Sequence, residues 1–299
     1  MHILIGGASG FLGTHLGREL ETRGHTVTRL VRRPATAPSE SRWDPASGGV
    51  DPQVIEAADV VVNLAGAPTA GNPHSQQWAD NLRESRVRST ATLATAIASS
   101  ERKPAFLAGN GISVYGDHGS EPLTETADPR GDALLTEVSQ AWEAAAEPAR
   151  EAGARVCILR TAPVMDVRSQ PLKSLRLLFR LGLGGRLGDG RQYFPMISLR
   201  DWVGGVAHLA EHSEARGAFN LCCPETPTNA EFTQALGHAL GRPTLIPAPA
   251  FAIRIGAARM APELLGSKNT VPQALIDAGY EFRDQDVTSV LAAGLAQSS

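Results

Sequence analysis

A glycine-containing run near the N-terminus constrains the fold more than any other feature of this sequence. It consists of Gly7, Ala8, Ser9, Gly10, Phe11, Leu12 and Gly13. An apolar segment, residues 2–6, precedes the run, and a helical pattern, residues 11–23, begins within it. Between a strand and a helix, such glycines allow a tight turn, close backbone approach to a pyrophosphate, and close helix–strand packing. Because a helix N-terminus also attracts phosphate, we predict that these seven residues bind a dinucleotide; ordinary helix-start geometry is the alternative.

Strand-like and helix-like patterns alternate through the first half of the chain. Apolar runs predict strands at residues 2–6, 25–31, 59–63, 105–109 and 155–159. Helical spacing predicts helices at residues 11–23, 78–98 and 132–152. This alternation, with short glycine-marked turns, predicts a Rossmann-type α/β fold, in which a doubly wound parallel sheet is covered by helices on both faces.

The alternation breaks after about Val164. We predict a dinucleotide-binding Rossmann domain over residues 1–165 and a smaller α/β substrate-binding subdomain over residues 166–299, with a strand-helix unit near residues 199–222 returning to the sheet. Further helical patterns occupy residues 229–240, 271–278 and 287–295. Residues 181–191, LGLGGRLGDGR, form a glycine-rich loop that we expect to be too flexible for the core.

Composition excludes several classes of function. Among 299 residues, 42% are hydrophobic and 20% charged, and the net charge is −3, so there is no basic surface for nucleic acid or an anionic membrane. The sequence shows no membrane-length apolar run and no secretory signal pattern. The three cysteines lack disulfide or metal-ligand spacing. We therefore expect a reduced, cytoplasmic monomer or homodimer without a metal, acting on a small molecule.

The end of the second predicted strand indicates which dinucleotide binds. A site for NAD normally carries an acidic residue there for the ribose 2′-hydroxyl. Here the residues are Arg32 and Arg33, with no carboxylate in the run from Val27 to Pro34. Guanidinium groups suit a 2′-phosphate, whereas a solvated basic turn is the alternative. We predict NADP(H) as the cofactor.

Two further segments are candidates for the nucleotide site. Leu64, Ala65 and Gly66 follow the third strand of the alternating pattern at its carboxyl end, where open α/β sheets bind ligands. Trp43 and Asp44 offer a ring and a hydrogen-bond acceptor for the adenine, or else only pack a loop.

Several motifs, taken together, resemble a known family. Gly7–Gly13, the Asn63-Leu-Ala-Gly turn and Val114-Tyr115-Gly116 resemble the extended short-chain dehydrogenase/reductases of the NAD-dependent epimerase/dehydratase group. More narrowly, the chain resembles the SulA-like "epimerase family protein" branch of that group. The similar segments are residues 84–86, 141–145, 179–185, 190–192, 228–232, 264–266 and 271–272. The resemblance covers essentially the whole chain. It implies an extended Rossmann fold, a nicotinamide dinucleotide at the first βα turn, and a substrate cleft roofed by the C-terminal subdomain.

The usual catalytic apparatus of that family is missing. No tyrosine or lysine lies between Gly116 and Leu172, and the slots of the Tyr-x-x-x-Lys pair fall near Leu135 and Ser139. The expected hydroxyl position falls near Asn110 or Gly111. We take Tyr115 and Asn110 as candidate catalytic residues, with packing at a strand end as the alternative for Tyr115. Arg86 matches the place where extended reductases put an asparagine facing the active site, and we assign it to the cofactor site.

For the substrate we single out Arg186, Arg191, Gln192 and Tyr193, in or next to the glycine-rich loop. The arginines can clamp an anionic or carbonyl-bearing ligand, or simply be solvated. The sequence thus favours an NADP(H)-dependent reductase or redox-assisted epimerase. A non-catalytic dinucleotide-sensing or scaffold protein and a non-redox lyase or cyclase on the same fold remain open.

Overall fold

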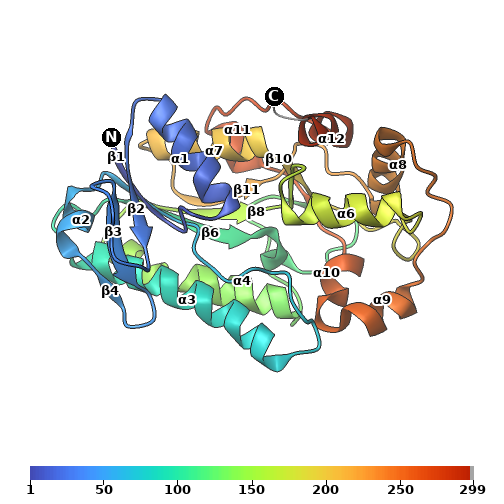
Figure 1. Ribbon diagram of the computed structural model, residues 1–299, viewed down its shortest axis with the longest axis horizontal. Helices are drawn as coiled ribbons and strands as arrows, with labels where there is room; N and C mark the ends of the chain where they lie inside the picture. The colour runs from blue at the N-terminus through green and yellow to red at the C-terminus, as the bar shows by residue number, and fades with distance from the viewer. Residues whose placement is uncertain (297–299) are drawn as a thin grey trace.

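The computed structural model describes residues 1–296, and its centre is a single eight-stranded sheet (Figure 1). The strands are β1 (His2–Gly6), β2 (Thr26–Val31), β3 (Glu40–Asp44), β4 (Gly49–Val50), β5 (Val60–Asn63), β6 (Ala105–Gly111), β8 (Val156–Thr161) and β11 (Gly217–Leu221). Their order is β11-β8-β6-β5-β1-β2-β3-β4, and every pair is parallel except β3–β4. The chain runs outward from β1 in one direction and from β5 in the other, so the switch point of the sheet lies between them. The predicted doubly wound fold is confirmed.

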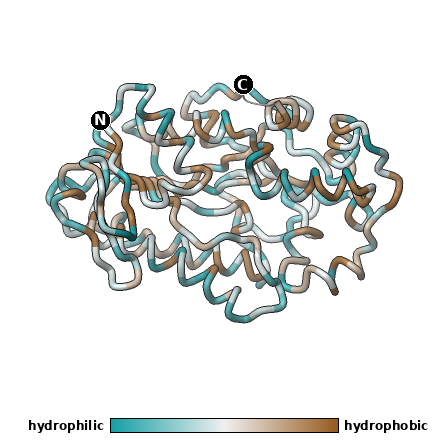
Figure 2. Tube along the Cα trace, in the orientation of Figure 1, coloured by the Kyte–Doolittle hydropathy of each residue, from teal (hydrophilic) through white to brown (hydrophobic). Residues whose placement is uncertain are grey.

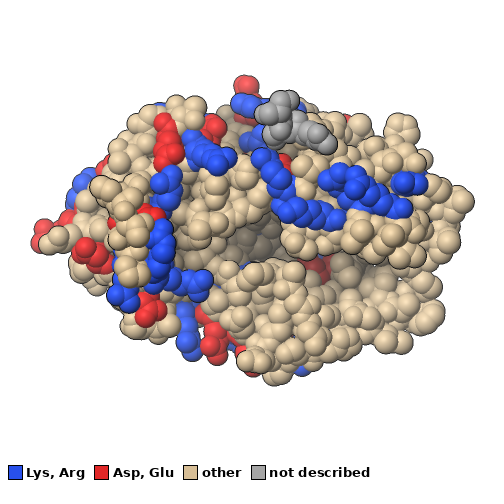
Figure 3. Space-filling view, viewed as in Figure 1, with Lys and Arg blue, Asp and Glu red and all other residues tan. Residues whose placement is uncertain are grey.

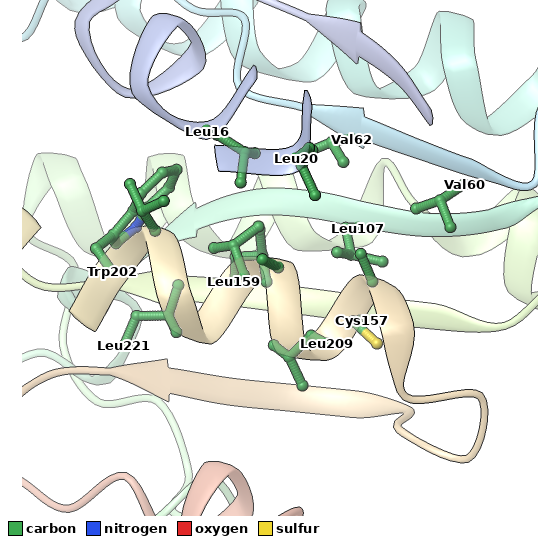
Figure 4. Packing of buried hydrophobic residues seen from close by; sticks show 14 of the residues in the cluster. Leu16, Leu20, Val60, Val62, Leu107, Cys157, Leu159, Trp202, Leu209 and Leu221 are labelled. Atoms are coloured by element: carbon green, nitrogen blue, oxygen red, sulfur yellow. The ribbon is translucent and has the colours of Figure 1, made fainter. Parts of the chain in front are cut away.

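Helices cover both faces of this sheet. On one face lie α1 (Phe11–Thr22), α7 (Leu199–Glu211) and α11 (Gln273–Asp277), and on the other α2 (Pro52–Ala57), α3 (Gln76–Ser99), α4 (Leu134–Ala144) and α5 (Glu147–Glu151). Figure 4 shows Leu16 and Leu20 of α1 opposite Trp202 and Leu209 of α7, packed over the strand side chains. Apolar residues run along the central strands, whereas the covering helices alternate in hydropathy (Figure 2). Burial on both faces explains why the strands read as near-continuous apolar runs.

The C-terminal part of the chain builds a second, helix-rich layer beyond the carboxyl edge of the sheet (Figure 1). It contains α6 (Gln170–Arg180), α8 (Asn229–Leu240), α9 (Ala250–Ala257), α10 (Ala261–Leu265) and α12 (Val287–Leu295), with the 3₁₀ helix η2 (Ala258–Met260). Buried side chains of α6, α8 and α12, such as Phe179, Phe232 and Leu291, form a core of their own. Two short parallel pairs lie outside the main sheet: β9 (Val164–Met165) with β10 (Ile197–Ser198), and β7 (Pro122–Leu123) with β12 (Asn269–Thr270).

One expectation about local structure is wrong. Residues 132–152 form two helices, α4 and α5, because Pro148 lacks an N–H group and cannot continue the first helix. The glycine-rich loop is packed in part: Gly184 and Gly190 are buried, whereas Leu181 and Leu183 are exposed. A side chain at Gly184 would overlap the ring of Phe179, and one at Gly185 would overlap the carbonyl of Ile246. The sequence patterns also did not predict β3, β4, α2, α6, α9 or α10.

We predict that Gly13→Ala lowers the free energy of unfolding by about 1–3 kcal/mol, because the added methyl group has no room. A Cβ at Gly13 would lie 2.7 Å from Ala8 Cα and overlap the Gly7 carbonyl. Gly17→Ala, one turn later in α1, is the matched control, since its nearest neighbour would be Ile5 Cδ1 at 4.0 Å. That variant should raise stability by up to about 1 kcal/mol through helix propensity. Equal urea midpoints for both variants would contradict the close-packing account.

Candidate dinucleotide site and substrate cavity

The glycine turn brings the N-terminus of α1 against the carboxyl end of β1. Gly7 has a φ of +79°, and a Cβ there would lie 2.6 Å from the carbonyl carbon of Leu64. Gly10 caps α1 without a side-chain hydrogen bond, and no acidic residue stands in the first helical turn. The first N–H groups of α1 therefore face outward with the positive end of the helix dipole, an arrangement that binds phosphate.

The turn after β5 packs against this glycine turn. The buried Asn63 donates from its amide to Thr90 Oγ1 at 2.8 Å and accepts from the backbone N–H of Ala65 at 3.1 Å. Leu64 donates its N–H to the carbonyl of Gly6 at 2.8 Å. At Gly66 a Cβ would lie 3.2 Å from Arg86 Cγ. Leu64, Ala65 and Gly66 are thus held in one fixed path beside the switch point, where the sequence predicted a nucleotide contact.

The two arginines after β2 have different surroundings. Arg33 is bound to Glu40 by contacts of 2.9 and 2.5 Å, and this guanidinium holds the pKa of Glu40 at about 2. Arg32 is exposed and forms no hydrogen bond or ion pair within residues 1–296. Figure 3 shows Lys and Arg side chains along the β2–β3 side of a central hollow. Of the two, Arg32 has the guanidinium that is free to meet a phosphate.

Trp43 and Asp44 lie on β3, beside this basic segment. Trp43 is only 3% exposed and belongs to the core on the α3 face, so the packing alternative describes its ring. Asp44 accepts from the backbone N–H of Ala46 at 2.9 Å, and this hydrogen bond lowers its pKa. The Asp44 carboxylate therefore stabilises its own turn.

A cavity of about 590 Å³ opens next to the glycine turn, in the hollow seen in Figure 3. Leu12 and Leu64 form its wall on the dinucleotide side, and the end of β6 forms its floor. Leu175 of α6 and Phe232 of α8 close it from the C-terminal layer. The cavity is within the size range of small-molecule sites and joins the two parts of the chain.

Two serine hydroxyls stand in this cavity where the missing catalytic groups would be. Leu135 and Ser139, the predicted slots of Tyr-x-x-x-Lys, both line it. A Cβ at Gly111 would lie 3.5 Å from Ser139 Oγ and 4.0 Å from Ser113 Oγ. Neither hydroxyl has a hydrogen-bond partner among residues 1–296. Ser139 occupies one of the two Tyr-x-x-x-Lys slots, and Ser113 is the hydroxyl residue nearest Asn110 and Gly111, but neither serine was predicted as a site residue from the sequence.

The two candidate catalytic residues are held by other groups. Asn110 lines the cavity, but its amide donates to Glu143 Oε2 at 3.2 Å and its Oδ1 accepts from the N–H of Gly111 at 2.7 Å. Tyr115, in the 3₁₀ helix η1 (Ile112–Tyr115), is fully buried and does not line the cavity.

The hydroxyl of Tyr115 is fixed between two buried partners. It donates to Asn220 Oδ1 at 2.8 Å and accepts from Arg160 Nη1 at 2.8 Å. Burial raises the pKa of this phenol to about 12, against the opposing effect of Arg160. The catalytic role expected for Tyr115 is therefore corrected to the packing alternative, because its hydroxyl is fully buried against Arg160 and Asn220 and lies outside the cavity lining.

Arg86 of α3 lies on the cavity wall over the ring of Trp142, with 5.1 Å between its Cζ and the ring centroid. It donates to the carbonyl of Leu82 at 3.1 Å and to Thr69 Oγ1 at 3.4 Å. Desolvation lowers its pKa to about 10, so it remains charged at neutral pH. No carboxylate pairs with it in the described part of the chain. Arg86 thus gives the cavity a partly buried positive charge.

Of the predicted substrate residues, only Tyr193 lines the cavity. Arg186 and Arg191 are exposed and lie outside its lining, which favours the solvated alternative for both. Gln192 is buried and donates to the carbonyl of Leu187 at 3.0 Å, so it holds the glycine-rich loop together. Lys268 and Glu263 also line the cavity, but they lie in no recognisable motif and so were not predicted from the sequence.

Among residues 1–296, no group of three or more His, Cys, Asp or Glu side chains lies together as a metal site. In the same part of the chain, no helix is both long enough and apolar enough to cross a bilayer.

A doubly wound sheet with a glycine turn at its switch point and a cavity at its carboxyl edge defines an extended Rossmann protein of the short-chain dehydrogenase/reductase type. Residues 3–222 match the NAD dependent epimerase/dehydratase family, and residues 248–293 match a domain of unknown function, DUF1731. The chain belongs to the epimerase/dehydratase family, as the resemblance of its motifs implied.

Relatives match over nearly the whole chain. An epimerase family protein of Mycobacterium leprae is 36% identical over 97% of this chain and 94% of its own length. The human epimerase family protein SDR39U1, solved with NADPH, superposes with a TM-score of 0.86 at 30% identity, covering 98% of this chain and 99% of that one. A nucleoside-diphosphate sugar epimerase from Corynebacterium glutamicum gives 0.81 at 31% identity, covering 99% of this chain and 58% of that one.

We predict that Tyr115→Phe lowers the free energy of unfolding by about 1–3 kcal/mol, because Arg160 and Asn220 lose a buried hydrogen-bond partner. The dinucleotide affinity of this variant should stay within about twofold of the unmodified protein's. Removing a group outside the cavity is expected to change the binding free energy by only a few tenths of a kcal/mol. Tyr193→Phe is the control for stability, because the Tyr193 hydroxyl has no hydrogen bond within residues 1–296. Denaturant unfolding and ligand titration on the same samples measure both effects. If Tyr115→Phe leaves the stability unchanged but abolishes dinucleotide binding, Tyr115 would have to be part of the binding site after all.

Proposed function

We propose that this chain binds NADP(H) at the carboxyl edge of the sheet and acts as a reductase or redox-assisted epimerase on a small molecule. The proposal rests on the continuity of the glycine turn with the cavity: Leu12 belongs to the turn, Leu64 packs against Gly7, and both line the cavity. A dinucleotide whose pyrophosphate meets the N-terminus of α1 extends from there toward the cavity. The NADPH in the human relative supports the choice of cofactor, although more distant structures of this fold contain NAD.

Each part of the proposed site has its own task. The N–H groups at the start of α1 bind the pyrophosphate, and Arg32 binds the 2′-phosphate. The hydroxyls of Ser113 and Ser139 donate hydrogen bonds to a substrate oxygen and orient the carbon that carries it. Bound NADP(H) supplies or accepts the hydride. Since no tyrosine or lysine fills the two family slots, we propose that the proton comes from solvent in the cavity.

The non-catalytic alternative also has a specific observation in its favour. Leu135 occupies the slot of the family's catalytic tyrosine and cannot donate a proton. A protein that only senses or is stabilised by the dinucleotide would retain the glycine turn and lose this group.

Deuterium transfer separates these two functions. We would supply NADPH carrying deuterium at the nicotinamide C4 position with a panel of ketones, aldehydes and imines. Deuterium in any product, measured by mass spectrometry, would eliminate the non-catalytic alternative. Oxidation of NADPH that continues without any candidate substrate would count against the reductase.

We predict that Arg32→Ala lowers the affinity for NADPH about tenfold to a hundredfold, the loss expected for one charge-assisted hydrogen bond, and leaves the affinity for NADH unchanged. Arg33→Ala should have a smaller effect, because its guanidinium is already bound to Glu40. Arg23→Ala, beyond the C-terminal end of α1, is the control. Fluorescence titration with both dinucleotides measures the ratio of the NADPH and NADH affinities. Equal losses of affinity for NADPH and NADH would show that Arg32 does not bind the 2′-phosphate.

A further inference from the structure

Lys268 places a buried ammonium group on the wall of the cavity. Its side chain is only 4% exposed, and it follows α10 at the start of the segment that leads into β12. The nearest carboxylate oxygen is Glu263 Oε1 at 3.5 Å. Glu263 is thus its ion-pair partner, and no hydrogen bond from Lys268 Nζ is formed within residues 1–296, so at least two of its three N–H donors are free to meet a ligand.

The charges of the lining do not balance. Arg86 and Lys268 are its cations and Glu263 is its carboxylate, which leaves one net positive charge. Arg86 lies over Trp142 on the α3–α4 side, whereas Lys268 comes from the C-terminal layer. Burying an ammonium group without hydrogen-bond partners is energetically unfavourable. An anionic oxygen that accepts hydrogen bonds from its N–H donors offsets this free energy.

The walls of the cavity that Lys268 lines are mainly apolar. Leu135 and Val138 contribute from α4, Leu175 and Phe179 from α6, and Phe232 and Leu264 from α8 and α10. Such walls favour a ligand with a carbon skeleton of matching size and few polar groups.

We propose that the substrate is a compact, largely apolar carboxylic acid, whose carboxylate is bound by Lys268 and whose reacting oxygen faces Ser113 and Ser139. This inference rests on the proposed function, because it takes the cavity to be the substrate side of the dinucleotide site. A nucleotide sugar is disfavoured, since its diphosphate needs clustered cations and the two cations of this lining stand on different elements.

The test is calorimetric titration of the full chain with phenylacetate, 3-phenylpropanoate and 4-phenylbutanoate, with and without saturating NADP⁺. The corresponding primary alcohols and UDP-glucose serve as comparison ligands. We expect at least one carboxylate to bind about tenfold or more tightly than its alcohol, the difference that a charge-assisted hydrogen bond supplies. Since NADP⁺ binding is measured separately, a failure of the dinucleotide proposal is distinguishable from a failure of this one.

Two variants test the role of Lys268 in opposite directions. Lys268→Met should abolish the preference for carboxylate over alcohol. Glu263→Gln removes the competing carboxylate and should raise carboxylate affinity severalfold, so it keeps the proposal testable if Lys268→Met fails to fold. Lys173→Met, at an exposed position on α6, is the matched control.

The proposal is overturned if UDP-glucose binds more tightly than every carboxylate. It is also overturned if alcohols and carboxylates bind equally, or if Glu263→Gln weakens carboxylate binding. If Lys268→Met still prefers carboxylates to alcohols, Arg86 and not Lys268 would be the residue that binds the anion. That result would also contradict the proposal.

Discussion

The contact between Gly13 and the Gly7–Ala8 backbone determines how close α1 comes to the end of β1. With a Cβ at Gly13 only 2.7 Å from Ala8 Cα, no larger residue fits without moving the helix. The same turn presses Gly7 against Leu64, so the path after β5 depends on it as well. One steric constraint therefore determines the position of three features. They are the free N–H groups of α1, the wall of the cavity on the nucleotide side, and the entrance to the cavity.

A buried polar network supports the floor of the cavity from below. Arg160 of β8, only 7% exposed, donates to Tyr115 and to Glu143 of α4, and Tyr115 donates to Asn220 of β11. Two of the joined elements carry the serines: Ser139 lies in α4 and Ser113 lies in η1. Because each partner would be costly to leave unsatisfied, the network fixes the geometry of the two serine hydroxyls without contacting a ligand.

The fold could be predicted from local patterns, whereas the site could be predicted only in part. The glycine turn, the strand-helix alternation and the slots at Leu135 and Ser139 depend on spacing within short segments. The burial of Tyr115 depends on Asn220 and Arg160, which are 105 and 45 positions away in the sequence, so its adjacent motif gave a misleading role. Lys268 lies in no periodic segment, and only the folded chain brings it to the cavity.

The most direct test of this account is titration of the unmodified protein with NADPH and, separately, with NADH, followed by nicotinamide fluorescence. Binding of NADPH at least about tenfold tighter than NADH is the predicted result, because the free Arg32 guanidinium supplies one charge-assisted hydrogen bond to the 2′-phosphate. Binding of neither dinucleotide would show that the glycine turn serves only the packing of α1 on β1, and would contradict the central claim.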